Sequence, residues 1–237
     1  MDLALQIENL ESGYGEVQVL WGISLEVSRG KMTTVIGANG AGKTTTLRTT
    51  MGSLRAWKGR ILLHGQDVTR LPPHTKANRG LVLVPEGRQL FPDMSVEENL
   101  EMGGYSHRAR KRHKQNLERV YELFPRLKER RTQKSATLSG GEQQMLAMGR
   151  GLMQDPDVLM IDELSLGLAP VLAQQLFLTL KTLREQGLTI VLVEQNVHLA
   201  LAMSDYTYVL SEGRISIRGE SEEVAKMDEV RKAYLGL

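Results

Sequence analysis

Residues 37–45 constrain the fold of this chain more than any other stretch. They fit the pattern Gly-x-x-x-x-Gly-Lys-[Ser/Thr] of a phosphate-binding loop. Residues 33–36 are typical of a buried strand and residues 43–51 of a helix, which is the context that the pattern requires. A Gly-rich turn without a ligand is the alternative, and this context disfavours it. The stretch therefore predicts a site for the phosphates of a nucleotide.

The chemistry of this loop follows from its residue types. Glycines let successive backbone N–H groups point at one spot, and the helix behind them adds the positive end of its dipole. Lys43 is placed to reach the terminal phosphates, and the hydroxyl of Thr44 is placed to hold magnesium.

Composition limits the class of protein. The 237 residues are enough for one large domain or two small ones, and a net charge of +2 is too small to indicate nucleic-acid binding. Without cysteine, the chain forms no disulfide and no thiolate metal site. The apolar runs at 81–84, 158–161 and 189–193 are too short to span a bilayer and suit the buried strands of a parallel sheet. We expect a soluble protein that reaches a membrane only through a partner.

Residues 17–27 alternate with a period of two, which predicts a half-buried antiparallel strand. The expected apolar face consists of Val17, Val19, Trp21, Ile23, Leu25 and Val27. Tyr14 lies in the turn before this strand. An aromatic residue in a turn most often covers a sheet edge, but ahead of a phosphate loop Tyr14 is also a candidate to stack on a nucleotide base.

Basic residues dominate the segment from Arg108 to Lys134. A nucleic-acid patch or a contact with anionic lipid is one interpretation. The other is the solvated face of an amphipathic helix, since Leu117, Val120 and Tyr121 recur at helical spacing. We favour the solvated face, because few aromatic residues interleave with the charges.

Residues 138–144 predict a second helix N-terminus suited to anions. Ser139 and Glu142 have the spacing of a capping box, and two glycines between them leave backbone N–H groups unpaired. A plain helix cap is the alternative, but the position downstream of a phosphate loop favours an anion site. Ser95 and Glu98 predict another capping box, at the start of a short helix.

The buried strand predicted at 158–163 ends in two carboxylates, Asp162 and Glu163. Ligands of open parallel sheets bind at such strand ends. An Asp there can order magnesium through water, and the adjacent Glu can take a proton from an attacking water. Further on, the pattern predicts a helix at 170–185, a strand at 188–193, a hairpin at 206–217, and two short final helices.

With these motifs in place, the whole chain resembles the ATP-binding subunit of an ATP-binding-cassette (ABC) transporter. The phosphate loop, the signature at 138–144 and the carboxylate-ending strand stand in the order and spacing of that family. Residues 84–88, 165–170 and 192–196 resemble the subgroup that serves branched-chain amino acid importers (LivF-like).

The resemblance implies an α/β fold: a RecA-like P-loop NTPase core with an antiparallel β layer and an inserted helical subdomain. The core would comprise residues 1–87 and 156–237, and the helical subdomain residues 88–155, within a single ABC ATPase domain. Two such subunits, identical or different, would pair head to tail and drive transmembrane permease subunits.

The resemblance also implies site residues and cofactors, namely ATP and Mg²⁺. The ATP-binding positions are Tyr14, Gly37, Ala38, Asn39, Gly40, Ala41, Gly42, Lys43, Thr44 and Thr45. The signature positions, acting on the partner's ATP, are Leu138, Ser139, Gly140, Gly141 and Glu142. The metal-side positions are Thr44, Glu86 and Asp162, and the catalytic positions are Lys43, Glu163 (the general base) and Gln195.

Four residues depart from the general cassette pattern. Glu86 stands where the Q-loop glutamine is usual, Gln195 where the switch histidine is usual, and Ala169 where the D-loop aspartate is usual. These three match the subgroup. Leu164 replaces a proline after the base, and we expect it to loosen the turn that holds Glu163.

The function expected from the resemblance is ATP hydrolysis that powers uptake of branched-chain amino acids, at the cytoplasmic face of the membrane. A solute-binding protein outside the cell would act indirectly, and nucleic acid would not be a partner. An importer of urea or short amides is a near alternative, and a non-transport ABC ATPase acting on nucleic acid or the ribosome is a distant one. A regulator without hydrolysis is disfavoured by Glu163.

Overall fold

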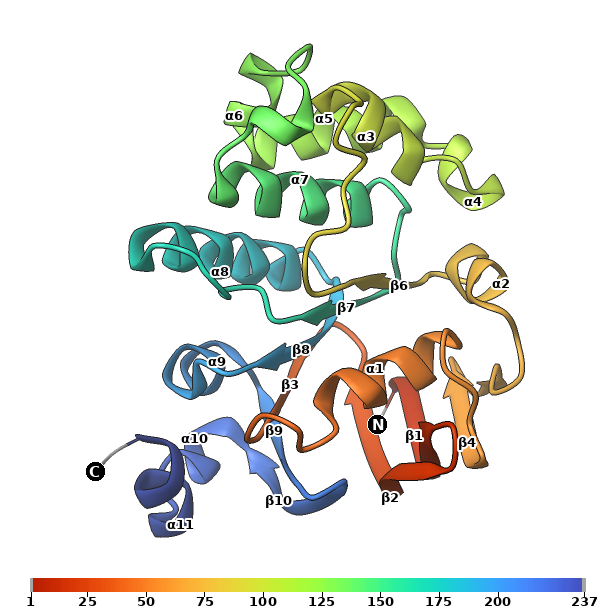
Figure 1. Cartoon of the computed structure of the whole chain (residues 1–237), viewed down its shortest axis with the longest axis vertical. Helices are drawn as coiled ribbons and strands as arrows, with labels where there is room; N and C mark the ends of the chain where they lie inside the picture. Colours follow the sequence, from red (N-terminus) through yellow and green to blue (C-terminus); the bar gives the residue numbers. More distant parts are fainter. Residues whose placement is uncertain (1, 236–237) are drawn as a thin grey trace.

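The computed structural model describes residues 2–235, whose strands form two sheets (Figure 1). The larger sheet has the order β10-β9-β3-β8-β7-β6. Its strands are β3 (Met32–Ile36), β6 (Leu81–Val84), β7 (Val158–Asp162), β8 (Thr189–Glu194), β9 (Tyr206–Ser211) and β10 (Arg214–Glu220). Neighbours pair in parallel except β9 and β10, which form the predicted hairpin. The apolar runs are buried along their length in β3, β7 and β8, as a parallel sheet requires.

The smaller sheet is antiparallel, with the order β2-β1-β4-β5. Its strands are β1 (Leu3–Tyr14), β2 (Val17–Ser28), β4 (Lys58–Leu63) and β5 (Gln66–Asp67). The phosphate-loop helix α1 (Lys43–Met51) lies between the two sheets (Figure 1). Its Leu47 shares one hydrophobic cluster with Leu5 of the smaller sheet and Val35 of the larger. This packing fixes α1 against both sheets.

The face predicted for β2 is correct only in its second half. Ile23 is buried as expected, but before it the buried residue is Leu20, whereas Trp21 is 44% exposed. The pairing with β1 shifts between Trp21 and Ile23, which leaves Gly22 as an extra residue with φ of 76°. Such a β-bulge moves the alternation by one residue and exchanges the two faces. The prediction was therefore wrong for the first half of the strand.

The helical subdomain is inserted between β6 and β7 and lies at the top of Figure 1. Its elements are α3 (Val96–Gly103), α4 (His107–Arg110), α5 (His113–Leu123), α6 (Pro125–Glu129), the 3₁₀ turn η1 (Ser135–Thr137) and α7 (Gly140–Leu152). All fall within the predicted range 88–155, whose exact limits stay a prediction. Leu100 and Val120 close in on Gly149 of α7, where a Cβ would lie 2.9 Å from each side chain. Both capping boxes, Ser95 with Glu98 and Ser139 with Glu142, are confirmed.

The remaining helices cover the core sheet. Helix α8 (Pro170–Glu185) lies between the core sheet and the helical subdomain (Figure 1). The others are α2 (Pro73–Asn78), α9 (Val197–Met203), α10 (Ser221–Val224) and α11 (Asp228–Val230), followed by one π-helical turn (Arg231–Leu235). Within residues 2–235, no helix has both the length and the apolar character needed to cross a membrane.

Candidate nucleotide-binding site

The predicted phosphate loop connects β3 to α1 at the carboxyl edge of the core sheet. Gly42 caps α1 with φ of 106°, a conformation that L side chains rarely adopt. A Cβ on Gly37 would lie 2.3 Å from the carbonyl oxygen of Leu210, so only glycine fits where the loop passes β9. Gly42 is thus required by its backbone conformation, and Gly37 is required because there is no room for a side chain.

Lys43 and Thr44 begin α1 and point in different directions. The buried ammonium of Lys43 donates to the carbonyl oxygens of Gly37 at 2.9 Å and Ala38 at 3.1 Å. The hydroxyl of Thr44 donates to Oδ1 of Asp162 at 3.1 Å. The structure therefore joins the phosphate loop directly to the end of β7 and brings two of the expected metal-side residues into contact.

Asp162 lies in an environment that favours a cation. Burial raises its pKa to about 6; the hydrogen bond from Thr44 opposes this, and the negative charges of Glu86 and Glu163 add to it. Hydroxyl and carboxylate oxygens are the ligands that Mg²⁺ prefers. Among residues 2–235, no three His, Cys, Asp or Glu side chains are placed to hold a metal by themselves. A magnesium ion here would need Thr44 and the oxygens of bound phosphates as well.

Glu163 is held in a specific conformation beside Asp162. Its φ is 54°, its backbone N–H donates to the carbonyl of Val193 at 2.9 Å, and its side chain is buried. Both carboxylate oxygens accept from Nε2 of Gln195, at 2.9 and 3.1 Å. The sequence suggested that Gln195 faces a phosphate. The structure directs its amide donors to Glu163, which makes Gln195 an orienting partner of that carboxylate.

Glu194 is a site residue that sequence reasoning missed. Its buried carboxylate accepts from the backbone N–H of Ser165 at 2.8 Å, from the Ser165 hydroxyl at 2.8 Å and from the Asn196 N–H at 3.4 Å. Burial raises its pKa despite these hydrogen bonds. The sequence feature that could have indicated Glu194 is an acidic residue at the end of an apolar strand. The last residue of β8 thus holds the D-loop, residues 165–169, and the next residue holds Glu163.

The turn after Glu163 is well supported. We expected Leu164 to loosen it, but Leu164 is fully buried in the core shared with the helical subdomain. Glu163 and Ser165, on either side, are hydrogen-bonded to β8. Leu164 therefore anchors the turn by packing.

Tyr14 and Glu86 reach the site from different sheets. Tyr14 ends β1, is 45% exposed, and places its hydroxyl 3.5 Å from that of Thr45. Glu86 follows β6, is exposed, and raises the pKa of Asp162. Both positions suit the expected roles in base stacking and metal binding, which stay predictions.

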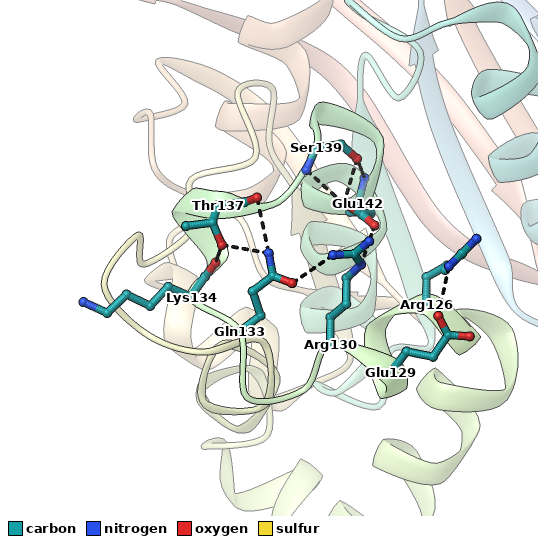
Figure 2. A network of polar contacts seen from close by, with 8 residues as sticks. All are labelled: Arg126, Glu129, Arg130, Gln133, Lys134, Thr137, Ser139 and Glu142. Carbon is teal, nitrogen blue, oxygen red and sulfur yellow. Dashed lines mark hydrogen bonds and ion pairs between the residues drawn. The ribbon is translucent and has the colours of Figure 1, made fainter.

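The signature segment begins α7 in the helical subdomain, and Figure 2 shows its polar contacts. Ser139 donates from its backbone N–H and its hydroxyl to Oε2 of Glu142, at 2.9 and 2.8 Å, and its Oγ accepts from the Glu142 N–H at 3.4 Å. Leu172 of α8 packs so closely on Gly141 that a Cβ would lie 2.6 Å from it. Leu138 is buried and Ser139 is exposed. The helix terminus is thus rigidly built and open to solvent.

Comparison with known proteins agrees with this geometry. The sequence pattern of the family described as ABC transporter matches residues 20–165. The chain is 46% identical to the high-affinity branched-chain amino acid transport ATP-binding protein BraG of Pseudomonas aeruginosa, over 98% of this chain and 99% of that protein. It is 36% identical to the probable branched-chain amino acid transport ATP-binding protein LivF of Archaeoglobus fulgidus, over 98% and 99%.

The fold agrees as well. The ADP conformation of an ATP-binding cassette of an ABC transporter superimposes over 100% of both chains, with a TM-score of 0.87 and 28% identity. The chain therefore belongs to the ABC transporter family, as an ATP-binding subunit. Subunits of this family bind nucleotide, couple ATP hydrolysis to transport, dimerise and work with transmembrane permease subunits.

Proposed function

We propose that this chain hydrolyses ATP to power uptake of branched-chain amino acids through partner permease subunits. One observation above others supports the hydrolysis. The Thr44 hydroxyl is hydrogen-bonded to Asp162, and the adjacent carboxylate of Glu163 is oriented by Gln195. The solute class is supported by the similarity to BraG along nearly the whole of both chains.

In this proposal, the loop backbone and Lys43 hold the phosphates of ATP, and Tyr14 stacks on the adenine. Thr44, Asp162 and Glu86 would hold Mg²⁺, which would supply positive charge beside the phosphates. Glu163 accepts a proton from the attacking water, whose oxygen bonds to the γ-phosphorus as the bond to the β,γ-bridging oxygen breaks. ADP and phosphate are the products.

Glu163 can act as this base only if its carboxylate is aimed at the water. Its backbone bond to Val193 and its contact with Gln195 fix that direction without neutralising the charge, since a glutamine amide is uncharged. The contacts from the single amide nitrogen of Gln195 still leave lone pairs of the carboxylate free to accept a proton.

Gln195→His tests this orienting role. We expect turnover within about tenfold of wild type, because a neutral imidazole N–H can still donate to Glu163. Below a pH of about 6.5 the imidazole becomes charged, lowers the proton affinity of Glu163, and reduces turnover relative to wild type. Turnover at saturating ATP, measured against pH for both proteins, checks this. Parallel profiles would contradict a contact between residue 195 and the base.

The proposal also includes the second subunit and the membrane. Two copies, or this chain and a related one, pair head to tail so that Ser139 and Gly141 cover the ATP on the partner's loop. The complex then sits at the cytoplasmic face of the membrane, and a solute-binding protein acts through the permease.

Residues 90–96 are the segment that we propose to contact the permease. Phe91 is 41% exposed, and its ring lies 5.5 Å from the guanidinium of Arg150. Its backbone is fixed by Asn99, whose side chain accepts from the Phe91 N–H at 2.9 Å and donates to its carbonyl at 3.0 Å. A cavity of about 330 Å³ extends from Leu90 to Glu163. The residues on either side of Phe91, Leu90 and Pro92, thus line a cavity that reaches the base.

Phe91→Asp is expected to leave basal ATPase activity of the isolated protein intact and to uncouple it from transport, because a charge replaces the exposed aromatic contact. Solute uptake and ATPase activity, measured together in the complete complex, check this. Tyr105→Asp is the matched control, since Tyr105 is 71% exposed on the same subdomain and also stacks on an arginine. Unchanged transport in the Phe91 variant would contradict the docking role.

The solute class is tested with the complete transporter. The chain is co-purified with its membrane partners, reconstituted in vesicles and assayed with the solute-binding protein. Leucine, isoleucine or valine is expected to stimulate ATPase activity and to accumulate. Stimulation by urea or short amides alone would favour the related importer, and co-purification without any permease would favour a non-transport ATPase.

A further inference from the structure

The signature helix carries a negative charge where the proposed function needs an anion site. Glu142 lies in the first turn of α7, and its Oε2 accepts both the N–H and the hydroxyl of Ser139. A carboxylate stabilises a helix N-terminus. The same charge repels a phosphate brought to that terminus, and it occupies the only hydroxyl donor of Ser139.

Arg130 compensates for this charge. It follows α6, and its Nε lies 2.8 Å from Oε1 of Glu142, the oxygen that Ser139 does not use (Figure 2). Glu142 is largely withdrawn from solvent and Arg130 is half-buried, with 16% and 39% of their side chains exposed, respectively. Burial tends to raise the pKa of Glu142, but the hydrogen bonds from Ser139, the charge of Arg130 and the smaller effect of the Arg126 charge outweigh it and hold the pKa below its usual value. Glu142 is therefore ionised and paired.

The guanidinium of Arg130 is itself held in place. It donates to Oε1 of Gln133 at 3.0 Å, and Nε2 of Gln133 donates to the Thr137 hydroxyl at 2.8 Å and to the Thr137 carbonyl at 3.3 Å (Figure 2). Thr137 in turn donates to the carbonyl of Lys134 at 2.8 Å. The ion pair is thus part of an ordered network. By contrast, Arg126 contacts only the exposed Glu129 among the residues drawn there.

We propose that Arg130 is a positioning residue of the signature segment. It neutralises and fixes Glu142, so that the Ser139 hydroxyl can exchange the carboxylate for a γ-phosphate oxygen of ATP bound to a second copy of the chain. The proposal rests on the head-to-tail pairing proposed above. Arg130 touches no nucleotide itself and acts through Glu142.

Arg130→Gln tests the proposal. We expect the ATP concentration at half-maximal turnover to rise about fivefold, the upper range for a partly exposed charge pair. Turnover at saturating ATP is expected to stay within about twofold of wild type, because base and metal ligands are untouched. ADP affinity is expected to be unchanged, because ADP has no γ-phosphate. Arg126→Gln is the comparison variant: its charge acts on Glu142 only from a distance, without an ion pair to Glu142, so we expect a smaller rise than for Arg130→Gln.

A double-mutant cycle between Arg130 and Glu142 distinguishes charge compensation from a merely structural role. If Arg130 acts by compensating Glu142, then Arg130→Gln has little effect on half-saturation in a Glu142→Gln background. Arg130→Lys keeps the charge, so its ATP concentration at half-maximal turnover is expected to stay close to that of wild type. An equal rise in both backgrounds, or no rise in either, overturns the proposal. If Arg130→Gln does not fold, Arg130→Met takes its place in the same cycle, and an equal rise in half-saturation in both backgrounds overturns the proposal.

Ser139→Ala separates a failure of this inference from a failure of the pairing. If Ser139→Ala leaves ATP-dependent dimerisation and turnover unchanged, the trans role of the signature is wrong. If Ser139→Ala impairs both while Arg130→Gln changes nothing, only the role of Arg130 is wrong.

Discussion

Lys43→Ala is expected to abolish ATP binding and hydrolysis. Lys43 is the only side-chain cation of the phosphate loop, and its ammonium is buried against the carbonyls of Gly37 and Ala38. A cation there balances the charge of the terminal phosphates, which backbone N–H groups alone do not. The substitution also removes the two hydrogen bonds that tie the loop together.

Thermal unfolding with and without nucleotide measures this directly. ATP at about one hundred times its Kd stabilises a folded protein by about 2.7 kcal/mol, or about 5–10 °C in Tm for a chain of this size. Wild type should show that rise and Lys43→Ala should show none. A rise equal to that of wild type would contradict the role of Lys43.

Lys76→Met is the matched control for loss of a buried lysine. Lys76 is fully buried, and its ammonium donates to the carbonyl of Thr50 at 2.7 Å, at the far end of α1. Burial lowers its pKa to about 8. The control variant should lose stability, because a helix C-terminus loses its cation, but it should keep the nucleotide-dependent rise in Tm.

Local patterns were enough to predict the elements that form the centre of the candidate site. The phosphate loop depends on consecutive residues, and each capping box joins residues three apart, such as Ser139 and Glu142. Burial on both faces made the core strands visible as apolar runs. The bulge at Gly22 was missed, because an isolated glycine within an alternating run does not show whether a residue is inserted there.

Contacts between distant residues could not be predicted from the sequence. Glu194 contacts Ser165, Gln195 contacts Glu163, and Arg130 contacts Glu142. The residues of each pair are distant in sequence, and the packing of whole helices and strands brings them together. The basic segment illustrates this limit. Most of its side chains are exposed, as the solvated interpretation predicts, yet Arg108 pairs with Asp157 and Arg130 with Glu142. Composition alone does not distinguish paired arginines from solvated ones.

Glu163→Gln is expected to keep ATP binding and to lower turnover by about a hundredfold or more, the typical contribution of a general base. The glutamine matches the shape of Glu163 and keeps an oxygen that can accept from Gln195, so the turn and its contacts with β8 are retained. What it lacks is a site that takes a proton at neutral pH. The loss should therefore fall on turnover and not on ATP affinity.

The same variant tests the head-to-tail pairing, because a subunit that binds ATP without cleaving it should remain closed on its partner. With ATP, Glu163→Gln should elute from a size-exclusion column as a dimer, while wild type should return to the monomer as ATP is consumed. Glu185→Gln, an exposed position at the end of α8, controls for the chemical change itself. Wild-type turnover in Glu163→Gln would assign the base to another residue. Low turnover with no ATP-dependent dimer would keep Glu163 as the base and refute the pairing, because the carboxylate and the proposed dimer contacts at Ser139 and Gly141 belong to different parts of the chain.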